Sequence, residues 1–373
     1  MQLRALIAVL CAAGCVGVAS AQVGRPATPD ALSGPKLAPD GGYHLEVGPY
    51  KVNTTESLVL HDAKRNKDLT VKVRVPVPTG PGDKNAKNEK FPMVVFSHGL
   101  GGSKDGFGEL CDHLCSYGYV VVCPTHADSI SERRKKGEKV TAANAFDIKL
   151  MDPEGRLNRM LDCRFILDSI PTLEEKIPAL KSPGGQGKID PERLAMAGHS
   201  AGAYTTEVLC GMKIAQVGAL KGQELVEPRF KAAVVISGSG TNKLGITEQA
   251  WDDVKVPWLV ITGSKDVVSI SRETPESRQE PFKYARGKAK GGPPAYLVFI
   301  EGATHSSYAG KETSGLFGEK PTTDVRVIQN CVASSVLAFL DAHVKGDEKA
   351  AAWMEKGENM GAMSGGKARM ESK

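Results

Sequence analysis

Most of this 373-residue chain alternates short apolar runs with longer segments of helical periodicity. The apolar runs are typical of strands buried in a parallel sheet. The helical segments carry apolar residues on one face. This alternation predicts an α/β fold with a mostly parallel central sheet and helices on both faces. The expected strands lie at 93–96, 119–123, 193–197, 232–236, 258–262 and 296–300, and the expected helices at 106–117, 154–170, 201–212 and 324–343.

Two segments with alternating apolar residues precede this region, at 56–61 and 69–77. The polar residues 62–68 separate them, so the pattern predicts an antiparallel hairpin at one edge of the sheet. Hairpin and alternating region together define a single predicted domain, residues 42–345.

The first 21 residues have the pattern of an export signal. Arg4 precedes a short apolar core, and Ala-Ser-Ala at 19–21 forms a small-residue cleavage site. We therefore expect residues 1–21 to be removed and the mature protein to be secreted or periplasmic. One alternative is a buried first helix or strand. Another is a lipid anchor at Cys15, although the residues before this cysteine lack the large apolar side chain usual at such sites.

The segments that flank the predicted domain differ from it in composition. Residues 22–41 are rich in Pro, Gly and Ala and are expected to be a flexible leader. Residues 346–373 are rich in Gly, Lys, Met and Glu and are expected to be a flexible C-terminal tail.

Charge and hydropathy exclude several classes of protein. The 48 basic and 43 acidic residues are scattered and form no basic stripe, so we expect no nucleic-acid partner. The densest charged run, 132–136, lies in a polar segment that we interpret as a solvated loop, with a patch for an anionic partner as the alternative. After the N-terminus no apolar run approaches the roughly 20 residues that cross a bilayer, so no transmembrane segment is expected. We expect a monomer.

Six cysteines remain after removal of the export signal. An oxidising compartment would allow disulfides between them. Most lie on apolar faces of predicted elements, where cysteine acts as a small buried side chain. No cluster of cysteines and histidines has the spacing of a zinc site, so no metal ion is expected, and the pairing stays open. The six are Cys111, Cys115, Cys123, Cys163, Cys210 and Cys331.

The pentapeptide Gly-His-Ser-Ala-Gly at 198–202 lies between a predicted strand and a predicted helix. This strand–turn–helix context is that of a nucleophile elbow, in which two glycines permit a sharp turn that exposes the serine. The start of the helix also directs free N–H groups toward the place where negative charge develops. Ser200 is therefore the candidate nucleophile.

A serine hydroxyl needs a base to remove its proton and an acid to orient that base. In this fold the acid and then the base follow the serine along the chain. His305 directly follows a predicted strand and is the candidate base, whereas His343 lies near the end of the last predicted helix. Asp266 also follows a strand and is the candidate acid. Its rivals Asp252 and Asp253 precede their strand, at the wrong end of the sheet.

Two backbone N–H groups are needed to bind the developing oxyanion. The amide of Ala201, directly after the nucleophile, is one candidate. The amide of Leu100 is the other, because it lies in a glycine-rich loop after the first parallel strand. His98 lies in the same loop, and we interpret it as a structural hydrogen-bonding residue and not as a catalytic base.

The chain resembles the α/β-hydrolase superfamily, in particular its platelet-activating-factor acetylhydrolase and dienelactone-hydrolase-like branch. The resemblance rests on Phe-Ser-His-Gly-Leu-Gly-Gly at 96–102, Cys-Pro-Thr-His-Ala-Asp-Ser at 123–129 and the pentapeptide of Ser200, and it covers about residues 45–345. It implies a triad of Ser200, Asp266 and His305, with Leu100 and Ala201 as oxyanion donors.

The sequence thus predicts a secreted serine carboxylic-ester hydrolase that forms an acyl-enzyme and needs no cofactor. The substrate would be a small-molecule, lipid or polymer ester. Alternatives with the same machinery are a polyester or cutin hydrolase, a phospholipid acetylhydrolase, a thioesterase and a peptidase. A non-catalytic binding protein of the same fold is the alternative from another class.

Two features depart from the phospholipid-acting relatives. Ala201 is small where they often have a bulky residue, and no apolar lipid-docking helix is evident. The side chains of Trp251, Trp258 and Tyr204 could line the acyl pocket or belong to the core. The sequence leaves open whether 129–157 forms a lid.

Overall fold

The computed structural model describes residues 41–79, 89–141, 143–182, 184–241, 245–312 and 318–373. The expected export signal, Cys15 and all but the last residue of the expected leader lie outside these residues.

The described part of the chain forms one nine-stranded sheet in the order β1-β2-β4-β3-β5-β6-β7-β8-β9. The six strands from β4 to β8 in this order are parallel, and the pairs at the two edges are antiparallel. The predicted fold class and hairpin are confirmed. The strands are β1 (Tyr50–Asp62), β2 (Lys67–Pro78), β3 (Phe91–Ser97), β4 (Val120–Thr125), β5 (Ile189–His199), β6 (Phe230–Ile236), β7 (Trp258–Lys265), β8 (Ala295–Thr304) and β9 (Ala368–Ser372).

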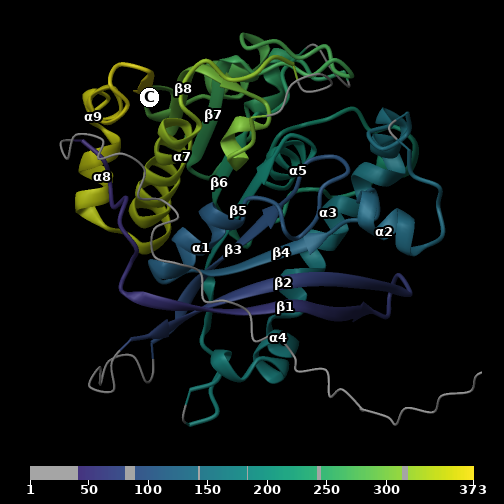
Figure 1. The fold of residues 1–373 in the computed structure, drawn as a ribbon. Helices are drawn as coiled ribbons and strands as arrows, with labels where there is room; N and C mark the ends of the chain where they lie inside the picture. Colours follow the sequence, from purple (N-terminus) through teal and green to yellow (C-terminus); the bar gives the residue numbers. More distant parts are fainter. Residues whose placement is uncertain (1–40, 80–88, 142, 183, 242–244, 313–317) are drawn as a thin grey trace, which may run out of the picture.

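Helices cover both faces of the sheet (Figure 1). Helices α3 and α5 pack on one face, and α1, α7, α8 and α9 on the other. The expected helices are present, and the polar segment after β4 contains the short helix α2. The helices are α1 (Gly108–Ser116), α2 (Ile130–Lys135), α3 (Pro153–Asp168), α4 (Ile170–Lys176), α5 (Ala201–Leu209), α6 (Glu280–Tyr284), α7 (Val325–Leu340), α8 (Glu348–Met354) and α9 (Glu358–Met363).

The central strands are apolar at every position because both of their faces are covered. In β3, Met93 and Val95 belong to the core on the α3 and α5 face. Val94 and Phe96, which alternate with them, belong to the core on the α1 and α7 face. A continuous apolar run is the pattern expected of a strand buried on both sides.

The expected flexible tail at 346–373 is wrong. Residues in this segment form α8, α9 and β9, and β9 pairs antiparallel with β8 as an edge strand. Met354, Met360 and Met363 are at most 1% exposed and extend the core of the α7 face. Methionine fills irregular apolar gaps well, so a methionine-rich segment can be a packed one. The domain therefore continues to the last strand.

Within the described residues, Val325–Lys345 is long and apolar enough to cross a membrane by length and composition. It contains α7, and 78% of its most apolar window is buried inside the molecule. This burial is that of a core helix.

All six cysteines after the expected export signal are buried with free thiols. The Sγ atoms of Cys111 and Cys123 are 3.7 Å apart. Their burial agrees with the interpretation of these residues as small core side chains.

Candidate active site

Ser200 occupies a strained turn between β5 and α5. Its φ of 57° and ψ of −115° are rare for a residue other than glycine. A Cβ atom at Gly198 would collide with the carbonyl of Gly202, and one at Gly202 would collide with the carbonyl of Ser97. Glycine is thus required on both sides of the serine, and the sharp turn exposes its hydroxyl.

Three side chains that are far apart in the sequence form a hydrogen-bonded row. His305 Nε2 lies 2.9 Å from Ser200 Oγ, and His305 Nδ1 lies 2.8 Å from Asp266 Oδ1. Each residue directly follows a parallel strand, β5 for the serine, β7 for the aspartate and β8 for the histidine. Parallel strands end at one edge of the sheet, which places the three side chains together.

The alternative acids and base lie elsewhere. His343 contacts the hydroxyl of Tyr296 at 3.2 Å in the turn that ends α7. Asp253 pairs with Lys213, and Asp252 precedes β7. None of the three alternatives contacts Ser200.

The carboxylate of Asp266 is fully buried and surrounded by donors. The hydroxyls of Thr262 and Tyr308 donate to Oδ2, each at 3.0 Å. The Arg278 Nε lies 3.1 Å from Oδ1. Burial alone would raise the pKa of Asp266, but the Arg278 charge and the hydrogen bonds hold this pKa well below its usual range. The carboxylate therefore stays ionised.

The sequence analysis missed Ser237, whose hydroxyl contacts both Asp266 and His305. Its Oγ donates to Asp266 Oδ1 at 2.8 Å and lies 2.8 Å from His305 Nδ1. It follows β6 with a φ of 57°, at the same sheet edge as Ser200. This position at a strand end was the signal that could have revealed it.

The two residues whose amides are expected to bind an oxyanion, Leu100 and Ala201, both line the cavity that contains Ser200. Ala201 is the first residue of α5, where N–H groups have no partner within the helix. Among the described residues, neither Leu100 N–H nor Ala201 N–H donates to another group. Both are therefore available to a ligand oxygen.

A buried ion pair holds the loop that carries Leu100. Arg159 is bonded to Asp128 through Nε at 2.9 Å and Nη2 at 2.7 Å, and its Nη1 donates to the His98 carbonyl at 2.7 Å. Asp128 accepts the N–H of Gly101 at 3.0 Å. The ion pair thus fixes the backbone on both sides of the Leu100 amide.

The structural hydrogen-bonding role expected of His98 is confirmed. Its Nε2 accepts the N–H of His126 at 3.0 Å, so Nδ1 carries the hydrogen and donates to the Gly99 carbonyl at 2.6 Å. Both ring nitrogens are used to hold the loop.

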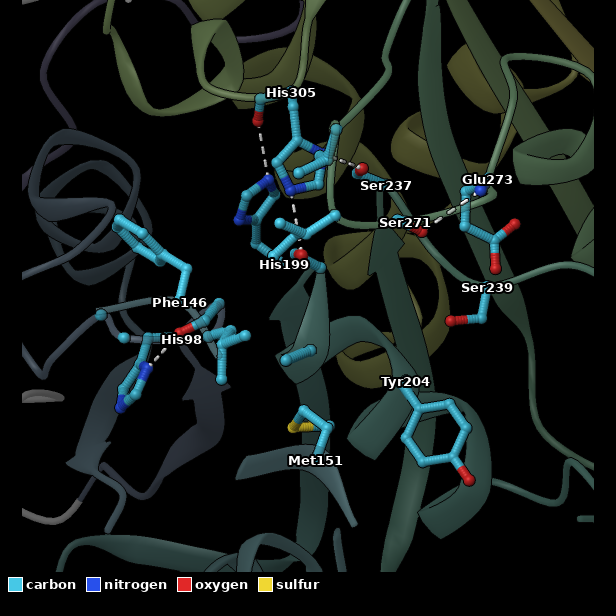
Figure 2. A pocket seen from close by; sticks show the side chains of 18 of the residues that line it. His98, Phe146, Met151, His199, Tyr204, Ser237, Ser239, Ser271, Glu273 and His305 are labelled. Atoms are coloured by element: carbon cyan, nitrogen blue, oxygen red, sulfur yellow. Dashed lines mark hydrogen bonds between the residues drawn. The ribbon is translucent and has the colours of Figure 1, made fainter. Parts of the chain in front are cut away.

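Ser200 lines a cavity of about 600 Å³. The His305 side chain lines the same cavity (Figure 2). Ile130, Phe146 and Met151 line it, so part of 129–157 forms the cavity. Tyr204 also lines it. The two tryptophans considered as pocket residues, Trp251 and Trp258, are buried in the core instead. Among the described residues, no group of three or more histidine, cysteine or acidic side chains is placed to hold a metal ion.

Four buried histidines are kept neutral by their surroundings. Burial lowers the pKa of His98 to about 3 and that of His113 to about 4. Burial also lowers the pKa of His126 and, more strongly, that of His199. The neutral His199 ring donates from Nε2 to the carbonyl of His305 at 2.8 Å, which anchors the backbone of the candidate base.

We expect the free energy of unfolding to fall as the pH is lowered from 7.5 to 5. Below about pH 6.5 the unfolded chain binds protons at these histidines that the folded chain does not bind. His98 and His113 should each remove roughly 2 kcal/mol between pH 6.5 and pH 5, because each proton costs about 1.4 kcal/mol per pH unit. Urea denaturation at several pH values measures this slope. The substitution His113→Gln should reduce this slope by the contribution of one proton taken up on unfolding. A free energy of unfolding that rises toward pH 5 would contradict the expectation.

Comparisons with known proteins match two parts of this chain to known families. Residues 55–150 match the family described as "Platelet-activating factor acetylhydrolase, isoform II", and residues 192–277 match the family described as "Serine hydrolase (FSH1)". The first range contains the Leu100 loop, and the second contains Ser200 and Asp266.

Two relatives are similar over short stretches. A "Putative phospholipase A2" of Schizosaccharomyces pombe is 45% identical over 42 residues, which is 11% of this chain and 10% of that protein. A "Platelet-activating factor acetylhydrolase" of Cavia porcellus is 23% identical over 135 residues, which is 31% of each chain. The chain thus matches less than a third of the length of either relative.

Proposed function

Because the chain is a serine hydrolase with an α/β-hydrolase fold, related to platelet-activating factor acetylhydrolases, we propose that it hydrolyses carboxylic esters through Ser200, His305 and Asp266. The observation that carries this proposal is the hydrogen-bonded row of hydroxyl, imidazole and carboxylate, with contacts of 2.9 and 2.8 Å. This arrangement activates a serine for attack on an acyl carbon.

In the proposed first half-reaction, Ser200 Oγ bonds to the ester carbonyl carbon while its proton passes to His305 Nε2. The negative oxygen that forms accepts the N–H groups of Leu100 and Ala201. Collapse of this intermediate breaks the bond to the alcohol, which leaves with the proton from His305. The product of this half-reaction is an acyl-enzyme.

In the second half-reaction, water attacks the acyl carbon and His305 takes its proton. The bond to Ser200 then breaks, the proton returns to the serine, and the acid is released. Asp266 stays ionised throughout, holds the imidazole in the required tautomer and stabilises its cationic form.

Phospholipid and acetyl esters are the second candidate substrate class. The match of residues 55–150 and the similarity to the guinea pig protein favour them. The small Ala201 after the nucleophile and the core position of α7 favour esters that need no docking helix. Hydrolysis rates across acyl lengths, for simple esters, phospholipids and polyesters, distinguish these classes.

We also propose that the protein is exported, on the basis of the signal pattern in residues 1–21. The N-terminal sequence of the mature protein tests this, and a mature chain that begins at Met1 would contradict it.

A fluorophosphonate probe should label Ser200 alone. The probe reacts with a serine whose proton is removed by a neighbouring base, and His305 Nε2 contacts Ser200. Ser237 lies on the other nitrogen of the same ring and donates to Asp266, so it should not react. Mass spectrometry of the labelled peptides measures the site. Labelling that persists in Ser200→Ala, or that occurs at Ser237, would overturn the assignment.

A further inference from the structure

Arg156 places a charged guanidinium on the wall of the cavity that contains Ser200. It lies in the first turn of α3, and its side chain is buried, since the residue is 5% exposed. Its Nη1 donates to the hydroxyl of Tyr204 at 3.0 Å, and its Nε lies 3.4 Å from the carbonyl oxygen of Asp152. The side chain is thus held in one position.

This guanidinium has no carboxylate partner in the described part of the chain. No acidic oxygen lies within 4.0 Å of it, and its Nη2 makes no hydrogen bond there. Arg159, one turn further along α3, is instead paired with Asp128. Arginine is always ionised, and a buried charge is costly unless something pairs with it. An incoming anion would supply the missing partner.

Tyr204 adds a second donor at the same place. Its hydroxyl oxygen accepts from Arg156, and among the described residues no acceptor receives its own hydrogen. Burial raises the pKa of Tyr204, so the hydroxyl keeps this hydrogen at neutral pH. The ring also lies against the guanidinium, 5.8 Å from its carbon.

Arg156, Tyr204 and Ser200 line the same cavity of about 600 Å³, so one substrate can contact all three. Tyr204 N–H donates to the Ser200 carbonyl at 3.0 Å, so the two residues are separated by one helical turn, about 5.4 Å along α5. Figure 2 shows the Tyr204 and His305 side chains in opposite parts of the view of the cavity.

The other charged side chains of the cavity are engaged elsewhere or exposed. Asp152 caps α3, and Arg278 contacts Asp266. Glu273 is buried. Its Oε2 accepts the N–H of Gly240 and the hydroxyl of Ser277, and its Oε1 has no hydrogen-bond partner among the described residues. Lys311 is exposed and would add to the positive charge.

We propose that Arg156 and Tyr204 form a subsite for an anionic group, a carboxylate or a phosphate, on the ester that Ser200 attacks. The proposal rests on the proposed ester hydrolysis and names a substrate class for it: esters with a negative charge a few bonds from the carbonyl. A planar guanidinium suits both anions because it can donate to two oxygens at once.

Matched ester substrates test this subsite. The anionic substrates are 4-nitrophenyl hydrogen adipate and the phosphonate-terminated ester of the same length, and the neutral one is 4-nitrophenyl hexanoate. The native protein should have a higher kcat/KM for at least one anionic ester than for the neutral ester, and the preferred one identifies the anion. In Arg156→Gln this ratio should fall about 10- to 100-fold, as expected for the loss of charge-assisted hydrogen bonds.

Two further variants complete the test: one removes a charge from the same helix outside the cavity, and the other tests the subsite without replacing Arg156. Arg164→Gln removes a cation from the same helix that bonds to the Val226 carbonyl outside the cavity, so its ratio should equal that of the native protein. Tyr204→Phe removes only the hydroxyl and should lower the ratio several-fold, which tests the subsite even if Arg156→Gln does not fold.

Two results have different meanings. If neutral esters are hydrolysed in a Ser200-dependent manner but the native protein prefers them, or the ratio is unchanged in Arg156→Gln and Tyr204→Phe, the subsite proposal is wrong. If no ester is hydrolysed and Ser200 is not labelled, the proposed function itself fails.

Discussion

Replacing Ser200 with alanine should lower kcat for hydrolysis of 4-nitrophenyl butanoate about a million-fold. The substitution removes the oxygen that lies 2.9 Å from His305 Nε2, so no acyl-enzyme can form. Removal of one member of such a row costs nearly as much as removal of all of them, because the members act as a unit. The remaining activity would come from the cavity and the two oxyanion amides.

The control for this variant is Ser57→Ala, an exposed serine on β1 far along the sheet from the cavity. It should retain native activity. Circular dichroism establishes that Ser200→Ala is folded, since alanine must adopt the positive φ of this turn. Residual rates should be measured with independently purified batches to exclude contaminating hydrolases. A loss smaller than about a hundredfold would show that another nucleophile operates.

The parallel part of the fold could be predicted because helices cover both faces of its strands, and strands buried on both faces are apolar at every position. Strands such as β3 are apolar without interruption, and several of them are followed by a segment of helical periodicity. The C-terminal elements could not be predicted in this way. Strand β9 is short, and α8 and α9 pack through methionine and alanine within a segment rich in glycine and lysine. Their structure depends on contacts with β8 and α7.

The part of the candidate site that could be predicted consists of residues that directly follow parallel strands. Ser200, Asp266 and His305 each come directly after a parallel strand, so one rule about the sheet edge brings them together. Arg278 and Tyr308 contact the same carboxylate, but neither belongs to a motif. Their positions depend on how the chain returns after β7 and β8, which sequence periodicity does not encode.

Arg156 illustrates the same limit. In the sequence it is one of several cations in a helix whose apolar face was expected to pack on the sheet. Its burial in the cavity, and the absence of a carboxylate beside it among the described residues, appear only when α3 and α5 are placed together. Arg159, three residues later, looks equivalent in the sequence but is neutralised by Asp128.

Replacing Asp266 with asparagine should lower kcat about ten-thousand-fold while leaving the serine and histidine in place. The carboxylate accepts hydrogen bonds from His305 and Ser237 at Oδ1, and from two hydroxyls at Oδ2. An amide can preserve part of this pattern, because hydroxyl groups can reverse and accept from its NH₂ group. The negative charge, however, cannot be preserved.

Loss of this charge acts twice on the base. The imidazolium that forms when His305 takes a proton would lose its stabilising partner. The Arg278 guanidinium, 3.1 Å from the carboxylate, would remain and repel the same cation. In the native protein the Asp266 carboxyl stays ionised. The acid limb of the kcat/KM profile should therefore show no titration of Asp266. In the variant, the rate loss should persist across the pH range in which the protein is folded.

Asp252→Asn is the matched control, because it alters the alternative acid that precedes β7. That carboxylate lies 3.8 Å from Arg286 at the surface and should be dispensable for activity. Asp266→Asn also leaves a buried arginine without its counter-charge, so it should lower the free energy of unfolding by about 3–5 kcal/mol. Kinetics must therefore be measured at a temperature at which the variant is fully folded. If Asp266→Asn stays within tenfold of native kcat, or Asp252→Asn loses activity, the orienting acid has been misassigned.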